Sequence, residues 1–202
     1  MHLEDLVLID GKRLSIGNLI TIRQGEPVFS PLTGAFEPSP MELIKLAGQN
    51  NSWACCFFKS SDKSCGIYQH RPLECRLLKC WDPGELIGKI YRNAIKRTDI
   101  IVKANLANKW LIEHKEKCSY AELSQLAVRI QKNNDLTALA AGTGMINQDI
   151  NLRGQAIRAL KLNLAEELFY FGRPMFKSLS YFGLRIMENK NILEIVLKND
   201  LI

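Results

Sequence analysis

The sequence predicts an α+β protein, in which short N-terminal strands and a cysteine-bearing loop pack against a C-terminal helical bundle that ends in a β-hairpin. Three observations predict this class. Proline and glycine separate short apolar pieces over residues 1–54, which indicates strands and turns. After Pro83, apolar residues recur three and four positions apart, as they do in helices. Near the C-terminus, two short apolar runs flank the polar residues 188–191 and predict the hairpin.

Composition limits the organisation of the chain. Its 202 residues, 47% of them apolar, predict one domain over residues 1–202, with a β and cysteine-cluster lobe at 1–82 and a mainly helical lobe at 83–202. They exclude disorder as the main state. No window holds the roughly 18 consecutive apolar residues of a membrane span, and the first residues are acidic where a signal peptide is basic. We therefore expect a cytoplasmic protein without a membrane partner.

The basic residues predict little about partners. The net charge of +6 is spread without blocks of one sign, which indicates a mild preference for anionic partners. No stacking aromatics interleave with the basic residues 92–97, so we expect a solvated helix face there and no nucleic-acid partner. The partner expected is an unidentified protein or redox partner.

The N-terminal strands are short. Leu19–Ile22 is one expected strand. Residues 43–58, interrupted by the polar stretch 48–52, are typical of a hairpin whose second arm, residues 53–58, leads into the cysteine region.

The helical half contains four expected segments. Ser119 is the expected N-cap of a helix over residues 120–132, and the longest helix is expected over residues 153–171, before Gly172. Residues 142–145 lack the features of a phosphate-binding loop and are expected to connect two helices. The apolar stripes are Leu86, Ile90 and Ala94; Val102, Leu106 and Trp110; Leu123, Leu126 and Ile130; and Ile157, Leu160, Leu164, Leu168 and Phe171.

Cysteines are concentrated in one region, because five of the six fall between Cys55 and Cys80. In a reducing compartment such thiols are metal ligands or catalytic groups before they are disulfides. The spacing from Cys55 is Cys-x9-Cys-x9-Cys-x4-Cys, unlike the close pairs of a zinc finger, and it also fits buried inert thiols. In an extended arm Cys55 and Cys56 point to opposite faces, so one of them is expected to pack, and the pattern leaves open which.

A short helix is expected to carry Cys75. Pro72 suits its first turn, because the fixed φ and missing N–H of proline cost nothing there. In an unbroken helix Cys75 and Cys80 would lie about 140° apart, which is too wide for adjacent ligands. We therefore expect this helix to end near Lys79, before Pro83.

Charge in this region favours bound metal. Five basic and three acidic residues lie between positions 55 and 82, whereas four thiolates around Zn²⁺ or an iron–sulfur cube carry a net charge of about −2. Tyr68 and Arg71 can donate hydrogen bonds to ligand sulfur, together with Arg76. Arg71 can equally cap a helix or pair with Glu74.

These residues resemble the core motif of the YkgJ-type cysteine-cluster family, described as zinc- or iron-chelating domains. The matching residues are Cys65-Gly66-Ile67-Tyr68-x-x-Arg71-Pro72-x-x-Cys75-Arg76, then Cys80-Trp81-Asp82, and before them Trp53-x-Cys55-x-Phe57. The match is strong over residues 50–85, and the segments 2–5 and 21–26 also resemble members of that family.

The resemblance implies an iron–sulfur or iron site, with zinc as the alternative, held by Cys55, Cys65, Cys75 and Cys80. A related motif occurs in bacterial flagellin lysine methylases, where an iron–sulfur cluster is the accepted occupant. The family normally opens with a Cys-x-x-Cys-x-x-Cys-Cys run just before a segment like residues 2–5, and this chain begins at that segment. We therefore expect a shortened version or a member with fewer cysteines.

Three functions are compatible with such a site. The first is a redox or accessory role for an iron–sulfur or iron protein, and the second is a structural zinc module that binds partners. The third is a metal-dependent modification enzyme, although no His-Glu-x-x-His pattern or paired carboxylates supply a base. His70 and His114 lie in polar runs and are expected at the surface, and Cys118 is not expected to bind metal.

Overall fold

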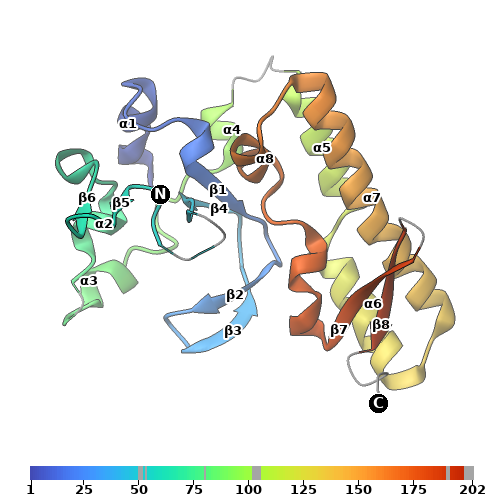
Figure 1. The fold of residues 1–202 in the computed structure, drawn as a ribbon. Helices are drawn as coiled ribbons and strands as arrows, with labels where there is room; N and C mark the ends of the chain where they lie inside the picture. Colours follow the sequence, from blue (N-terminus) through green and yellow to red (C-terminus); the bar gives the residue numbers. More distant parts are fainter. Residues whose placement is uncertain (50–51, 53, 80, 102–105, 190–191, 198–202) are drawn as a thin grey trace.

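The computed structural model describes residues 1–49, 52, 54–79, 81–101, 106–189 and 192–197. Short strands and the cysteine region lie at one end of the molecule, and a helical bundle with a β-hairpin lies at the other (Figure 1). The predicted α+β class is therefore confirmed. None of the helices in this part of the chain is both long enough and apolar enough to cross a lipid bilayer.

The strands that the structure describes form four two-stranded antiparallel ribbons. These ribbons join β1 (Leu19–Ile22) to β4 (Leu43–Leu46), β2 (Pro27–Ser30) to β3 (Ala35–Pro38), β5 (Phe58–Lys59) to β6 (Ser64–Cys65), and β7 (Leu184–Asn189) to β8 (Ile192–Leu197). The predicted strand at residues 19–22 and the predicted terminal hairpin are both confirmed.

The expected hairpin over residues 43–58 forms only in part, because β4 pairs with β1 and the contacts with the second arm begin at Ala47, whose carbonyl oxygen accepts the Cys56 N–H. Leu19 lies opposite Leu46 in this ribbon, and the side chains of Leu19 and Ile44 are fully buried. The Thr21 hydroxyl donates to the Phe169 carbonyl oxygen at 2.5 Å. The β1–β4 ribbon is thus fixed by burial against a distant helix, which is information that a local hairpin pattern does not contain.

The predicted second arm turns back only beyond the end of β4. Gly48 forms an isolated antiparallel bridge with Cys55. A Cβ atom at Gly48 would lie 2.1 Å from the Ser52 carbonyl oxygen, so the turn requires glycine. Trp53, the predicted start of this arm, lies outside the described residues.

The helices are α1 (Leu6–Asp10), α2 (Leu73–Leu77), α3 (Gly84–Ile87), α4 (Arg97–Ile100), α5 (Ala107–Lys117), α6 (Tyr120–Asn133), α7 (Leu136–Leu160) and α8 (Leu164–Phe171). The 3-10 segments are η1 (Leu3–Asp5), η2 (Ile16–Asn18), η3 (Tyr68–His70) and η4 (Met175–Phe182). Helix α6 confirms its prediction, since the Ser119 side chain accepts the Glu122 N–H and Leu123, Leu126 and Ile130 are buried.

The predicted helix over residues 153–171 is wrong, because two helices share that stretch. Helix α7 ends at Leu160, and Lys161 takes a left-handed conformation with φ of 55°. The Asn163 side chain then accepts two backbone N–H groups at the start of α8. Leu164 is consequently 78% exposed rather than buried, while Gly172 ends α8 as expected.

Two of the predicted apolar stripes also fail. Helix α3 ends at Ile87, and Asn93 has a φ of 53°, so no helix connects Leu86 to Ala94. Val102 lies outside the described residues, and Leu106 is 80% exposed just before α5 begins.

Residues 142–145 are not a connection between helices, because they lie inside α7. Their small side chains allow the terminal hairpin to approach. A Cβ atom at Gly142 would lie 3.1 Å from the Ile195 Cδ1 atom, and the Ile195 N–H donates to the Thr143 hydroxyl oxygen at 3.1 Å. Asn147 both donates to the Leu193 carbonyl and accepts its N–H. Gly142 therefore serves packing, whereas a Cβ atom at Gly144 would meet nothing within 4 Å.

Two apolar cores organise the molecule. The N-terminal core contains Met1, Leu14, Leu19, Ile44, Ile95, Ile101, Ala107, Ala156, Phe169, Tyr170 and Phe171. The C-terminal core contains Cys118, Tyr120, Leu123, Leu126, Ala127, Ile130, Ala138, Met145, Ile146, Leu152, Met175, Leu179, Leu184 and Ile195. Trp110 packs against both. The N-terminal core takes residues from both predicted lobes, 1–82 and 83–202, since α8 packs on β1.

Candidate metal centre

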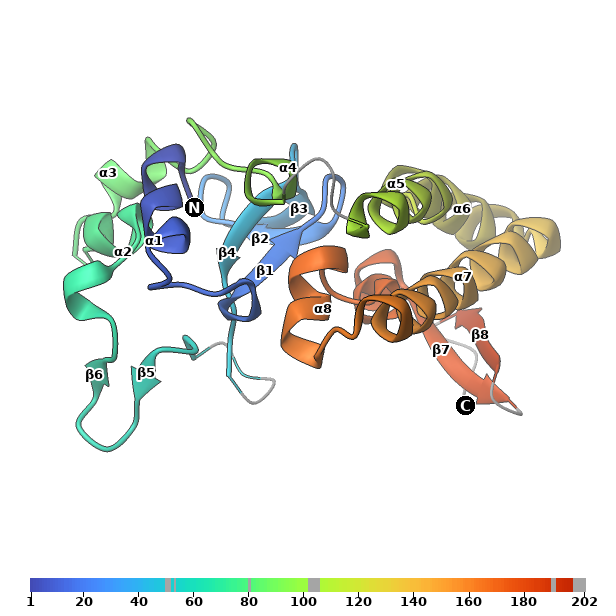
Figure 2. The same cartoon turned by 90° about the horizontal axis from the view of Figure 1, so that it is seen from above.

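Three of the four predicted ligands lie in the described part of the chain, at the end that carries β5, β6 and α2 (Figure 1, Figure 2). Cys55 precedes β5, Cys65 lies in β6 opposite Phe58, and Cys75 lies in α2. All three thiols are free and half-buried. Cys80 lies outside the described residues.

Cys55 and Cys56 have different surroundings. The Phe57 N–H donates to the Cys55 sulfur at 3.5 Å. The Cys56 thiol instead donates to the Asn18 carbonyl oxygen at 3.8 Å. Burial and the neighbouring Cys55 raise the pKa of Cys56 to about 11. The geometry therefore favours Cys55 as the ligand and Cys56 as a protonated packing residue.

Cys75 lies in the same electrostatic environment as the other two predicted ligands. Burial raises the pKa of the Cys75 thiol to about 11, and the charges of Cys55, Glu74 and Cys65 add to this rise. The three sulfur atoms do not, however, all lie within 4.8 Å of one another. They converge on one region without reaching the spacing of ligands on a single ion.

The residues expected around the ligands make other contacts. The Arg71 guanidinium lies 3.7 Å from the centre of the Tyr68 ring and donates to the Tyr68 carbonyl oxygen at 3.0 Å. Tyr68 itself is 59% exposed. Arg76 is exposed and forms an ion pair with Glu4. Arg71 does not pair with Glu74, whose carboxylate contacts the Met1 amino group and the His2 ring instead.

The segment at residues 2–5 holds α2 in place on both sides of Cys75. Asp5 is buried, and its Oδ1 accepts the Leu73 N–H at 2.8 Å while its Oδ2 accepts the His2 N–H at 2.9 Å. The His2 ring reaches Glu74, with Nε2 3.0 Å from Oε1. These contacts fix the helix turn that carries Cys75.

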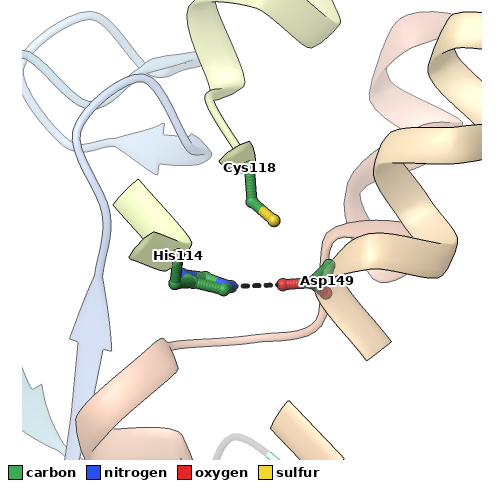
Figure 3. A group of neighbouring side chains, drawn as sticks. All are labelled: His114, Cys118 and Asp149. Atoms are coloured by element: carbon green, nitrogen blue, oxygen red, sulfur yellow. Dashed lines mark hydrogen bonds and ion pairs between the residues drawn. The ribbon is translucent and has the colours of Figure 1, made fainter. Parts of the chain in front are cut away.

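A second group of ligand-type residues lies between α5 and α7 (Figure 3). In the described part of the chain, His114, Cys118 and Asp149 are the group of His, Cys, Asp or Glu whose ligand atoms all lie within 4.8 Å of one another. The expected surface position of His114 is wrong, because its side chain is 1% exposed. His114 and Cys118 are four residues apart, so helical spacing brings both to the buried face.

Hydrogen bonds from three segments fix this group. His114 Nε2 lies 2.5 Å from Asp149 Oδ1, and Arg153 Nε donates to the same oxygen at 3.0 Å. The Met175 N–H donates to Asp149 Oδ2 at 2.9 Å. On the other side of the ring, Arg23 Nη1 lies 3.4 Å from His114 Nδ1. We call Arg23, His114, Asp149 and Arg153 the buried ion cluster.

Protonation in the buried ion cluster follows from burial and charge. Burial lowers the pKa of His114 to about 4; the Asp149 hydrogen bond opposes this, and the positive Arg23 reinforces it. Burial opposes ionisation of Asp149, but the His114 hydrogen bond and the Arg153 charge outweigh it and hold the Asp149 pKa below its usual range. His114 is therefore neutral and donates its Nε2 proton. Burial and Asp149 raise the pKa of Cys118 to about 12.

This arrangement is unsuited to a cation. Both Asp149 oxygens already accept hydrogen bonds, and the free lone pair of His114 faces a guanidinium. The charged side chains in and around the buried ion cluster balance with three of each sign: Arg23, Arg153 and Arg173 against Asp149, Glu26 and Glu167. Glu26 accepts the backbone N–H of Arg23 and forms its ion pair with Arg173. A divalent ion that displaced one thiol proton would add a net positive charge to a buried site.

The sequence carries a faint signal of this group. Asp149 and Arg153 are four residues apart, the spacing of a helical ion pair. Both are buried on α7 among apolar residues such as Ile146 and Leu152. Charges that fall on the apolar stripe of a helix predict buried partners.

Comparison with protein families, curated proteins and solved structures yields no match for this chain. The resemblance to the YkgJ-type proteins therefore stays a prediction from the cysteine motif.

Proposed function

We propose that this protein binds an iron–sulfur cluster through Cys55, Cys65, Cys75 and Cys80, and that the site has a redox or accessory role. The observation that supports this most strongly is the convergence of Cys55, Cys65 and Cys75 from three separate segments as free, half-buried thiols. Sulfur ligands of this kind suit iron–sulfur clusters and zinc.

Cys75 differs from Cys56 in the negative groups around it: besides burial, the charges of Cys55, Glu74, Cys65 and Asp5 raise its pKa, whereas the neighbour that raises the pKa of Cys56 is Cys55. Burial and the neighbouring negative groups raise the pKa of Cys75 to about 11, so its thiolate is unstable without a positive partner. A bound metal reverses this effect, because a coordinating thiol is deprotonated. The donor set therefore fits a metal cofactor, in contrast to the balanced charges of the buried ion cluster.

The spacing of the thiols favours a cluster over a single ion. Thiolates on one tetrahedral zinc ion lie about 3.8 Å apart, given Zn–S bonds of about 2.3 Å. In an iron–sulfur cube each cysteine binds a different iron, so the sulfur atoms stand farther apart. The described thiols do not all lie within 4.8 Å of one another, so as placed they are too widely spaced for one tetrahedral zinc ion.

An iron–sulfur cluster bound here would accept and release single electrons. The protein's part is to set the environment of the thiolates. The Phe57 N–H stabilises the Cys55 sulfur, and the contacts of Asp5 with the start of α2 position Cys75. Arg71 directly follows η3, and Arg76 lies in α2 directly after Cys75.

Metal and sulfide analysis with a visible spectrum, on protein purified without oxygen, tests the proposal. We expect iron, acid-labile sulfide and broad absorbance in the wild type. Cys55→Ser and Cys75→Ser should lose them, whereas Cys56→Ser should keep them, because that thiol is bonded to a backbone carbonyl. Circular dichroism shows whether each variant folds.

Two results would overturn the iron–sulfur assignment. Stoichiometric zinc, lost in Cys75→Ser, would establish the structural zinc module in its place. If neither the anaerobically purified nor the reconstituted protein contained metal, the proposal that this protein binds metal would be refuted.

A further inference from the structure

The buried ion cluster lies at the boundary between the two cores. The His114 ring packs edge-on against Phe171 of the N-terminal core, with ring centres 5.1 Å apart. Cys118, four residues later, belongs to the C-terminal core. On α7, Arg153 lies between Leu152 of the C-terminal core and Ala156 of the N-terminal core. The cluster thus joins the two cores.

Arg23 makes the surroundings of His114 sensitive to added charge. Arg23 is 6% exposed, and its Nε and Nη2 atoms have no hydrogen-bond partner among the described residues. Its Nη1 atom lies 3.4 Å from His114 Nδ1. A proton on Nδ1 would turn this hydrogen bond into a contact between two cations in a buried site.

We propose that His114 is a proton-sensitive element of the junction between the two cores. Neutral, its ring accepts from Arg23 and donates to Asp149, and so connects α5 to α7 and to the segment after β1. Protonated, it places a positive charge beside Arg23 that Asp149, already paired with Arg153, compensates only in part, and the junction opens.

The groups that surround the ring compensate that charge only in part. Asp149 is shared with Arg153, and Tyr120 and Cys118 are neutral. The remaining charges of the surroundings are already paired with one another, as Glu26 with Arg173 and Glu167 with Arg153.

The direction of the pH effect follows from the folded and open states. Burial lowers the pKa of His114 from its usual 6.5 to about 4 in the closed junction, whereas the open junction has the usual value. The open state therefore binds the proton more strongly. Protection of the junction is complete above pH 6.5 and is lost as the pH falls towards 4. At pH 5, these two values predict a loss of about 30-fold.

Hydrogen exchange at the Met175 amide tests the proposal, because this N–H donates to Asp149. Its protection factor is measured from pH 7.5 to pH 4.5 in the wild type, His114→Gln and His70→Gln. Glutamine retains a donor and an acceptor but does not titrate. We expect the acid loss in the wild type and in His70→Gln, whose side chain is exposed, and its absence in His114→Gln. Amides of β7 and β8 serve as an internal reference.

A second measurement tests the proposal even if His114→Gln does not fold. The ring proton resonances of His114 in the wild type should show no protonation until the pH approaches about 4. Arg23→Gln should move both this titration and the loss of Met175 protection to higher pH, because a neighbouring cation is removed.

Three results would overturn the proposal. One is a Met175 protection factor that does not change with pH in the wild type. Another is the same acid loss in His114→Gln as in the wild type, which would assign it to another group. The third is titration of the His114 ring near pH 6.5.

Discussion

The cysteine region and the buried ion cluster both gather groups that metals bind, but they differ in how charge is balanced. In the cysteine region, burial raises the pKa of Cys75, and the negative charges of Cys55, Glu74, Cys65 and Asp5 add to this rise. In the cluster, His114 is neutral and Asp149 is neutralised by Arg153. On this charge argument the cysteine region is the better candidate for a metal site, although its ligand atoms lie farther apart than those of His114, Cys118 and Asp149.

The largest effect that tests this comparison is expected at Asp149. Asp149→Ala removes the carboxylate that accepts hydrogen bonds from the buried Arg153 and His114, so we expect a loss of about 3–5 kcal/mol in the free energy of unfolding. Chemical denaturation measures it. The control is Glu113→Gln, which breaks the exposed ion pair with Lys117 and should cost about 0.5 kcal/mol or less.

Equal losses in the two variants would contradict the view that the cluster joins the cores. Tight zinc binding by the wild type that Asp149→Ala abolishes and Cys75→Ser leaves intact would contradict the charge argument. It would reassign the cluster as a metal site.

The cysteine region could be predicted from the sequence more readily than the buried ion cluster. Five cysteines between residues 55 and 80 mark the first region by composition alone. The cluster depends on His114, Asp149 and Arg23, which lie far apart in the chain and meet only after α5 and α7 pack. The charged neighbours of His114 suggested an exposed residue, although they occupy other faces of the same helix.

The fold shows the same division between local and distant information. Helix α6 was predictable because Ser119 and the apolar stripe are local signals. The pairing of β1 with β4 was not, since its register depends on burial against α8. The break after Leu160 depends on the cap at Asn163, a signal that the continuous apolar stripe concealed.

A smaller effect is expected from loosening α2 while the thiols stay unchanged. Asp5→Asn replaces one acceptor oxygen by a donor, so either Leu73 or His2 loses its hydrogen bond. We expect metal affinity to fall about 10- to 100-fold, as for other contacts that orient ligands. A competition titration with a chelator measures this, and Asp10→Asn, at an exposed position on α1, is the matched control.

Metal affinity equal to that of the wild type in Asp5→Asn would show that α2 does not need this contact to present Cys75. Hydrogen exchange of the Leu73 amide distinguishes loosening of α2 from loss of metal affinity, because it reports the loosening whether or not metal is bound.

The terminal hairpin offers a comparison remote from both sites. Asn147→Ala removes the side chain that holds the Leu193 N–H and carbonyl, at 3.2 and 2.7 Å. We expect a loss of about 1–2 kcal/mol, typical of two hydrogen bonds, with faster exchange confined to β7 and β8. Exchange at Met175 and metal affinity should stay unchanged.

The smallest expected effect concerns Arg71. Because its guanidinium stacks on the exposed Tyr68 ring, Arg71→Ala should cost about 0.5–1 kcal/mol or less in the free energy of unfolding. If Arg71 also acts on the bound cluster, the same variant shifts the reduction potential while metal content stays constant. Tyr68→Leu is the matched comparison, since it removes the ring and leaves the charge. A potential that changes in Arg71→Ala but not in Tyr68→Leu would assign the effect to the positive charge, whereas equal potentials in both variants and the wild type would reduce Arg71 to a packing role.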